Sequence, residues 1–465
     1  MTVPGIAITG MACLFPQAPG PEAFWDNVLS GVSAIGEPPA DWGGDLVVDP
    51  SAESDDRLPT ARGGYLGDLA EFDPLALGVM PSGLDGAEPE HALALRVGWE
   101  ALADAGCDAD TVDGERTEVV LGRGTYVNRG FVAFLQHTFA VEQTLRVLRT
   151  LHPEHTPQEL AEIKRELKAG LPPFTPETAP GLVSSVMCGR IANRLDLMGP
   201  AFVVDAACAS SLIAIDVGMS DLLAGKCDRV VAGGVQVSSS FPIQLIFARL
   251  GALSRSGQLR PFSADADGTL LGEGIGMVVL RRLRDAERDG DRIYAVIRAV
   301  GTASDGRGAG VLAPRVEGEV LAMRRAYERA DVAPGTVGLV EAHGTATPVG
   351  DAAELDALTR VFGENGSTPA HCALGSVKSM IGHTIPAAGA AGIIKAALAL
   401  HHRVLPPTLH CESPHPALRR SAFFLNDEPR PWVHGARSPR RAAVSAFGFG
   451  GIDAHAILEE HGGSR

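Results

Sequence analysis

Two segments of this chain are apolar around almost their whole circumference, and this feature restricts the fold more than any other. The segments span residues 212–223 and 387–400, and the second carries Lys395 as its only charge. A helix without a polar face must be buried on every side. Both segments are rich in Ala or Gly, which allow backbones to approach closely, so we expect two helices lying side by side between two sheets.

The rest of the chain alternates strand-like and helix-like segments, which is typical of a layered α/β architecture. A clear helical pattern covers residues 89–105 and ends at Gly106. The chain has 465 residues, 45% of them hydrophobic. Because single cores stop growing at about 250–300 residues, we expect two fused halves, residues 1–270 and 271–465.

Cys208 lies where the apolar run 202–204 gives way to a small-residue turn and then to the first apolar helix. The first turn of a helix has unpaired N–H groups and a partial positive charge, which stabilise a thiolate. We therefore expect a nucleophilic thiol with a pKa below the free value of about 8.5. The same amides are placed to bind an oxyanion. The alternative for a cysteine among Ala and Ser is an inert core residue.

Two histidines, His343 and His383, each follow a short apolar strand. Lys378 precedes His383 by five residues, and a Gly-Phe-Gly-Gly run at 448–451 follows another strand-like segment. In chain order, the sequence thus presents Cys, His, Lys and His at strand ends and then a glycine-rich turn.

This ordered set resembles the β-ketoacyl synthases, and most closely the ketosynthase domains of polyketide synthases. Residues 6–13 look like the opening strand of that family and residues 272–280 like a strand near its midpoint, so the resemblance runs nearly end to end. It implies the thiolase fold, an α/β structure of five layers, α-β-α-β-α, built from two pseudo-duplicated halves. The active site would lie where the halves meet.

The resemblance also implies a reaction, the decarboxylative Claisen condensation of an acyl chain on Cys208 with a malonyl-type thioester. Thioester exchange needs a thiol and an oxyanion hole, and carbon–carbon bond formation also needs donors to the thioester oxygen as carbon dioxide leaves. Neutral His343 and His383 would be those donors. The backbone amides of Cys208 and Phe449 would bind the oxyanion, and Phe449 would gate the site.

Supporting roles follow from the same resemblance. Lys378 would form a buried ion pair with Glu354 that holds both histidine loops. The hydroxyls of Thr345 and Thr347, two residues apart and facing the same way, would bind pantetheine amides. The alternatives are that Lys378 is exposed, that Glu354 lies on a helix surface, and that the two threonines reflect only β-propensity. The substrates would be carried on the phosphopantetheine of an acyl carrier protein, with no cofactor bound by this chain itself, and the chain would form a homodimer.

Three departures from the family pattern fall near these residues. Ala346 stands where many relatives have Gly or Ser, and Ile385-Pro386 stands where small or polar residues are frequent. Ile452-Asp453 replaces the usual Thr-Asn. We expect Asp453 to place a carboxylate near the site and to alter pKa values there.

Residues 126–181 form a stretch that looks longer than its counterpart in most such domains. It contains a well-defined helix signal, with Thr156 as N-cap, Pro157 at the first helical position and Glu159 completing a capping box, ending at Gly170. We expect a surface insertion. A dimer contact, a partner-docking element and a pocket wall remain alternatives.

Charge and cysteine content indicate the surroundings in which the chain works. With 56 acidic and 40 basic residues the net charge is −16, which disfavours nucleic-acid binding and requires a local basic patch for docking an acidic carrier protein. Arg255 and Arg260 are candidates for that patch. Seven scattered cysteines without metal-ligand spacing indicate reduced thiols and no metal site. Without a basic leader or an apolar run of about 20 residues, we expect a cytoplasmic location and no membrane association.

Several rival functions share parts of this pattern. A thiolase would have a second catalytic cysteine near its C-terminus, and a priming synthase would use Asn in place of the second histidine. A chain-length-factor-like scaffold would lack Cys208, and a non-elongating acyl-transfer ketosynthase usually has a damaged second histidine. Intact Cys208 and His383 therefore favour the elongating enzyme.

Overall fold

The computed structural model describes residues 5–42, 44, 47–49, 56–84, 86–107, 112–124, 128–237, 239–308, 310–364, 370–435 and 438–462. Its described strands build one eleven-stranded sheet and two small two-stranded pairs. The order in the large sheet is β12 (Phe423–Leu425), β10 (Cys372–Gly375), β9 (Leu339–Glu341), β14 (Arg441–Gly448), β15 (Ile452–Glu459), β8 (Ala295–Ser304), β1 (Ile6–Leu14), β7 (Gly274–Arg282), β6 (Arg229–Gln236), β4 (Thr117–Gly122) and β5 (Ala201–Val204). The pairs are β2 (Ile35–Gly36) with β3 (Gly63–Gly64), and β11 (Val404–Leu405) with β13 (Arg430–Pro431).

The large sheet consists of two sections that meet at one short contact, where β1 pairs with β8 through only three residues of each strand. The first section has the order β5-β4-β6-β7-β1, and the second has β10-β9-β14-β15-β8 with β12 added outside β10. If the five strands shared by both sections are numbered within each section by their position in the sequence, both sections have the same spatial order, 3-2-4-5-1. In both, the first three strands pair in parallel and the last two pair antiparallel.

This repeated order supports a division of the chain into two duplicated units. Because β7 lies between β1 and β6, it belongs with the first section, although it follows the boundary between 270 and 271 that the sequence suggested. We propose a boundary after β7, in the segment that precedes β8.

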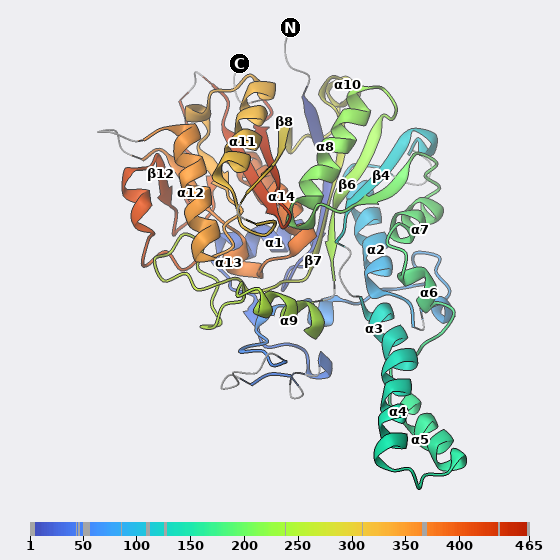
Figure 1. Cartoon of the computed structure of the whole chain (residues 1–465). Helices are drawn as coiled ribbons and strands as arrows, with labels where there is room; N and C mark the ends of the chain where they lie inside the picture. The colour runs from blue at the N-terminus through green and yellow to red at the C-terminus, as the bar shows by residue number, and fades with distance from the viewer. Residues whose placement is uncertain are drawn as a thin grey trace.

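Two helices occupy the space between the sections, as their composition predicts (Figure 1). Helix α8 (Ser210–Leu223) packs on β4 and β6 and also contacts β8, and α14 (Ala388–His402) packs on β14 and also contacts β7. The two helices contact each other. Every residue of α14 from Ala388 to Leu400 is buried, whereas α8 exposes Leu223 at its end. The glycines permit this packing, because a Cβ at Gly389 would clash with Leu212 and Ser211 of α8.

Helices on the outer faces complete five layers, α-β-α-β-α, and confirm the expected fold. Helix α2 (Pro89–Asp104) packs on β1 and β7 and against α7 (Val186–Arg194), whereas α11 (Val316–Ala330) packs on β8 and β15 and against α12 (Pro348–Phe362). The remaining helices outside residues 126–181 are α1 (Pro21–Leu29), α9 (Phe241–Arg249), α10 (Leu283–Asp289) and α13 (Lys378–Ile381). None of the helices in the described part combines the length and apolarity needed to span a bilayer.

The described part of the 126–181 stretch, which begins at 128, is helical, and its middle forms a hairpin that projects from the body (Figure 1). It consists of α3 (Arg129–Leu135), a π-helical turn (Gln136–Ala140), α4 (Val141–Leu151), α5 (Pro157–Ala169) and the short α6 (Thr178–Gly181). The predicted capping box is present: Thr156 Oγ1 accepts from the Glu159 N–H, and the Thr156 N–H donates to Glu159 Oε2 at 2.7 Å. Val141, Leu145 and Leu160 form a small separate core.

Candidate active site

The strand-to-helix turn expected at Cys208 is formed. Strand β5 ends at Val204, the short turn η7 (Ala207–Ala209) contains the cysteine, and α8 begins at Ser210. Ala207 has φ +49°, a left-handed conformation that costs an L-residue about 1 kcal/mol. The backbone N–H groups of Cys208 itself and of Phe449 both act on the Cys208 sulfur. Two donors from different segments thus converge on one atom.

The prediction that the Cys208 thiol has a lowered pKa is wrong. The pKa of Cys208 is raised to about 12, mainly by burial and to a smaller extent by the charge of Asp205. The Lys378 ammonium and the two backbone N–H groups lower the pKa but do not compensate for the desolvation. The sequence indicated the helix terminus but not that Cys208 would be only 3% exposed, in an apolar cluster with Phe247 and others.

His383 contacts the sulfur directly, with Nε2 3.1 Å from Cys208 Sγ. Its other ring nitrogen, Nδ1, accepts a hydrogen bond from the backbone N–H of Ile385 at 3.2 Å. A nitrogen that accepts an N–H carries no proton, so in the neutral ring the proton sits on Nε2. Burial and the Lys378 charge hold the pKa of His383 well below its usual value, which keeps the ring neutral.

His343 is arranged in the same way. Its Nδ1 accepts from the backbone N–H of Phe447 at 3.3 Å, so its proton also sits on Nε2. The rings of His343 and His383 are 5.5 Å apart and nearly perpendicular. Burial, Lys378 and His383 lower the pKa of His343 well below its usual value. The site therefore contains two neutral imidazoles, each with a donating Nε2–H.

The predicted direct ion pair between Lys378 and Glu354 is not among the contacts of the described residues. Instead, both side chains bind the backbone around His343. Lys378 Nζ donates to the His343 carbonyl at 2.5 Å, whereas Glu354 accepts from the N–H groups of His343 and Gly344 at 2.8 Å each. Burial lowers the pKa of Lys378 and raises that of Glu354 to about 7, and the attraction between the two charges only partly opposes both shifts.

Two further carboxylates hold the same loops and were not singled out from the sequence. Asp351 accepts from the N–H groups of Phe262 and Ala346 at 2.6 and 3.0 Å. Glu341 at the end of β9 forms a buried ion pair with Lys395 at 2.6 Å and accepts from the Val377 N–H. The signal for this pair was Lys395 itself, because a single charge on an otherwise apolar helix requires a buried partner.

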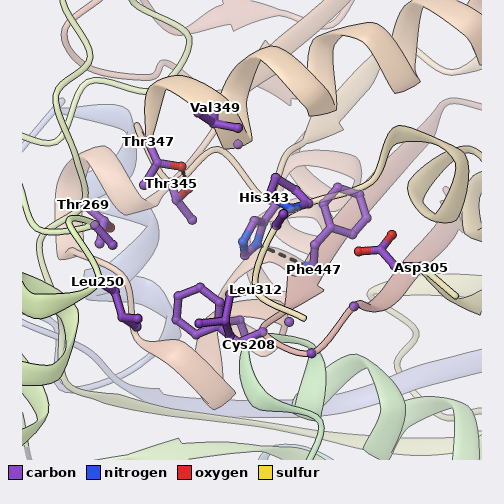
Figure 2. Close-up of a pocket in the computed structure, with 18 of the residues that line it drawn as sticks. Cys208, Leu250, Thr269, Asp305, Leu312, His343, Thr345, Thr347, Val349 and Phe447 are labelled. Carbon is purple, nitrogen blue, oxygen red and sulfur yellow. Dashed lines mark hydrogen bonds between the residues drawn. The ribbon is translucent and has the colours of Figure 1, made fainter. Parts of the chain in front are cut away.

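Cys208, His343 and His383 line one cavity of about 330 Å³ (Figure 2). Thr345 and Thr347 also line it, and their Oγ1 atoms lie 3.1 Å apart, so the two hydroxyls do face the same way. Other lining residues include Phe247, Leu250, Thr269, Leu312, Phe449 and Asp453. The Phe449 ring lies 5.5 Å from that of Phe247.

The three departures from the family pattern all bear on this cavity or its supports. Ala346, with φ +61°, and Ile385, with φ +46°, adopt the left-handed conformation that favours glycine. Both are completely buried. Asp453 lines the cavity and is 2% exposed, as expected for a carboxylate near the site.

Arg255 is exposed and Arg260 is half-buried, with its guanidinium on Gln258, and neither lines the cavity among the described residues. The described residues contain no group of three or more His, Cys, Asp or Glu arranged to bind a metal ion.

Comparison with family models gives two matches. The N-terminal domain of beta-ketoacyl synthase matches residues 4–286, and its C-terminal domain matches residues 294–412. Among solved structures, the chain is similar to the ketosynthase from module 6 of the bacillaene synthase of Bacillus subtilis 168, with a TM-score of 0.82, 32% identity, and coverage of 98% of this chain and 72% of that one. An oxazolomycin ketosynthase domain from Streptomyces albus gives a TM-score of 0.84, 32% identity, and coverage of 99% and 75%.

Curated relatives are much longer synthases. One component of the phenolphthiocerol/phthiocerol polyketide synthase of Mycobacterium tuberculosis is 38% identical over 98% of this chain, which covers 27% of that protein. One component of the polyunsaturated fatty acid synthase of Thraustochytrium is 37% identical over 98% of this chain, which covers 16% of that protein. The chain thus spans about a quarter or less of the length of these relatives.

Proposed function

The chain belongs to the β-ketoacyl synthase family, as a ketosynthase domain of the kind found in polyketide and polyunsaturated fatty acid synthases, and we propose that it elongates an acyl chain bound to Cys208. One observation carries this proposal above the others. Two neutral histidines, whose Nε2–H groups have no backbone partner among the described residues, line one cavity with a cysteine whose raised pKa is partly lowered by two backbone N–H groups.

In the first step, the Cys208 sulfur attacks the carbonyl carbon of an acyl thioester. The oxygen becomes an oxyanion, for which the N–H groups of Cys208 and Phe449 are the donors. The carbon–sulfur bond to the carrier then breaks, and the departing thiol takes up the proton that Cys208 loses. The exchange therefore releases no proton to solvent. This suits Cys208, because burial raises the pKa of its thiol and the free thiolate is unfavourable.

In the second step, the malonyl thioester oxygen accepts from the Nε2–H groups of His343 and His383. Loss of carbon dioxide leaves an enolate, and these two donors stabilise its charge. The enolate carbon attacks the acyl carbonyl on Cys208, and the Cys208 sulfur leaves as thiolate and regains a proton from solvent. Neutral rings suit this role, because each donates a hydrogen bond while its proton stays in place.

The surroundings support the remaining assignments. Thr345 and Thr347 are proposed to bind the pantetheine amides of an acyl carrier protein, and Lys378 and Glu354 to hold the His343 loop. We also propose a homodimer, because β5 lies at the end of the sheet and offers an edge for pairing with a second copy. A cytoplasmic location is proposed from the seven cysteines, which form no disulfide in the described structure.

The test is intact-protein mass spectrometry with the butyryl thioester of N-acetylcysteamine, followed by malonyl carrier protein. We expect the wild type to gain one butyryl group and Cys208→Ala to gain none. His383→Ala should load but elongate at least about 100-fold more slowly, because one oxyanion donor contributes about that factor.

Normal elongation by His383→Ala would contradict the assignment. Loading of the wild type without a β-keto product would indicate a non-elongating acyl transferase, and absence of loading would indicate a non-catalytic scaffold.

A further inference from the structure

Three carboxyl groups line one part of the catalytic cavity, next to the turn that carries Phe449. Asp305 follows the end of β8, Glu319 lies in the first turn of α11, and Asp453 is the second residue of β15. Glu319 and Asp453 are each 2% exposed. In Figure 2, Asp305 lies on one side of His343, and Thr345 and Thr347 lie on the other. The condensation mechanism above uses none of the three.

The Asp305 and Asp453 carboxyls face each other without a donor. Asp305 Oδ1 and Asp453 Oδ2 are both buried, and neither receives a hydrogen bond from the described residues. A Cβ placed at Gly318 would clash with these same two oxygens. Both oxygens therefore lie next to the Gly318 backbone and close to each other. Two buried acceptors that meet in this way are satisfied if one proton lies between them.

The charged groups around the pair favour that proton. Burial and the neighbouring Asp305 raise the pKa of Asp453 to about 7. Burial also raises the pKa of Asp305, although the Arg315 backbone N–H and guanidinium oppose it; exposed Glu317 adds to the increase.

Glu319 faces the same pair from α11. Burial and the carboxylates of Glu354, Asp453, Asp305 and Asp356 raise the pKa of Glu319 to about 10, so it is neutral at pH 7. With Glu319 neutral and one proton shared by Asp305 and Asp453, the three carboxyl groups carry one negative charge rather than three.

Asp305 supports the turn that carries Phe449. Its backbone N–H donates to the Gly451 carbonyl at 3.0 Å, and the Gly451 N–H donates to the Gly448 carbonyl at 3.1 Å. Gly451 has φ +71°, and a Cβ there would lie 2.6 Å from Asp305 Cβ, so the turn rests directly on the aspartate. Asp453 follows this turn in β15 and pairs with Ala303 of β8. The turn that carries Phe449, whose N–H acts on the Cys208 sulfur, is thus held between Asp305 and the strand that contains Asp453.

We propose that Asp453 is a positioning residue, which in its protonated form hydrogen-bonds Asp305 and holds the Phe449 N–H on the Cys208 sulfur. When the proton is lost, two carboxylates face each other beneath the turn and displace it, and the oxyanion loses one donor. This inference rests on the proposed role of Cys208 as the acylated nucleophile. It makes acyl loading sensitive to pH through a residue other than Cys208 and the two histidines.

The test is the pH profile of Cys208 loading by the butyryl thioester of N-acetylcysteamine, for wild type and Asp453→Asn. An amide keeps the shape and the hydrogen bond of the protonated carboxyl but cannot ionise. The loading rate of Asp453→Asn divided by that of the wild type should rise about tenfold between pH 6 and pH 8, as the acid with a pKa of about 7 ionises. Glu328→Gln, which removes an exposed charge nine residues further along α11 than Glu319, is the matched control and should follow the wild-type profile.

Parallel profiles for wild type and Asp453→Asn would overturn the inference, as would a Glu328→Gln profile that matches Asp453→Asn. Should Asp453→Asn fail to fold, Asp305→Asn neutralises the same pair from the other side, and the same ratio decides. A wild type that is never acylated on Cys208 would instead contradict the proposed function.

Discussion

At the scale of single residues, the backbone decides which nitrogen of His343 and of His383 carries the proton. The N–H groups of Ile385 and Phe447 occupy Nδ1 of His383 and His343, respectively. Ile385 is only two residues from His383 in the sequence. Phe447, in contrast, is more than 100 residues from His343 and reaches it only in the folded chain. The residue types were predictable from the sequence, but their tautomers were not, because a tautomer depends on the partner that folding supplies.

This arrangement predicts the behaviour of the two rings in nitrogen-15 NMR of histidine-labelled protein. Both pKa values are lowered well below 6.5 by burial and by Lys378, so neither ring should take up a proton between pH 8 and pH 6. Both should show a protonated Nε2 and an unprotonated Nδ1 throughout. Spectra of His343→Ala and His383→Ala assign the signals, and exposed His152 serves as the internal reference. A catalytic ring protonated on Nδ1, or titrating near pH 6.5, would contradict the assignment.

At the scale of elements, α14 combines complete burial with one charge. Its apolar circumference indicated the central layer, and the structure places it there between β14 and β7. The sequence did not indicate what would neutralise Lys395. Its partner Glu341 lies 54 residues earlier, at the end of β9, and also accepts the N–H of Val377 at the start of the Lys378 loop. The pair thus connects the central helix to the strand that precedes His343.

Removal of Lys395 should therefore destabilise the fold far more than removal of a surface cation. Lys395→Met leaves Glu341 buried without its cation, which costs about 3–5 kcal/mol of unfolding free energy. Denaturant titration of Lys395→Met and of the double variant Lys395→Met/Glu341→Gln measures this, and the double variant should recover part of the loss. The control is Arg96→Ala, which removes the partly exposed Arg96–Glu100 pair on α2 and should cost at most about 1 kcal/mol. Equal losses in Lys395→Met and Arg96→Ala would show that the buried pair has no special role.

At the scale of the whole molecule, folding collects acids at the junction of the two sections and removes them from water. The pKa of Asp351, Glu354 and Asp453 rises to about 7, and that of Glu319 to about 10, with burial as the largest cause in each. Such carboxyls bind protons in the folded chain at pH values where the unfolded chain has lost them. Their contribution to stability is therefore present below the unfolded pKa and declines as pH rises towards the folded pKa.

We accordingly expect the unfolding free energy to fall as pH rises from 7.5 to 9. Above about pH 7.5 the buried histidines contribute little further change, because unfolded imidazoles with a pKa of about 6.5 are then mostly neutral as well. Buried cysteines with raised pKa values, such as Cys188 and Cys372, act in the same direction as the carboxyls. Each proton contributes a slope of about 1.4 kcal/mol per pH unit while it is bound only by the folded state. Glu319→Gln should lessen the slope between pH 7 and pH 9, as measured by urea titration at each pH. A stability that rises over this range, or a slope unchanged in Glu319→Gln, would contradict the raised pKa of Glu319.

The sequence alone determined the layered fold and which side chains are proposed to react. Both rest on local properties: a helix without a polar face must be buried, and a Cys, His, Lys and His series at strand ends is readable without coordinates. Tertiary structure alone decided the acidity of Cys208, the partners of Lys378 and Lys395, the histidine tautomers and the facing of Asp305 and Asp453. These properties depend on the depth of burial and on groups from distant segments, because desolvation and hydrogen bonding act through space rather than along the chain.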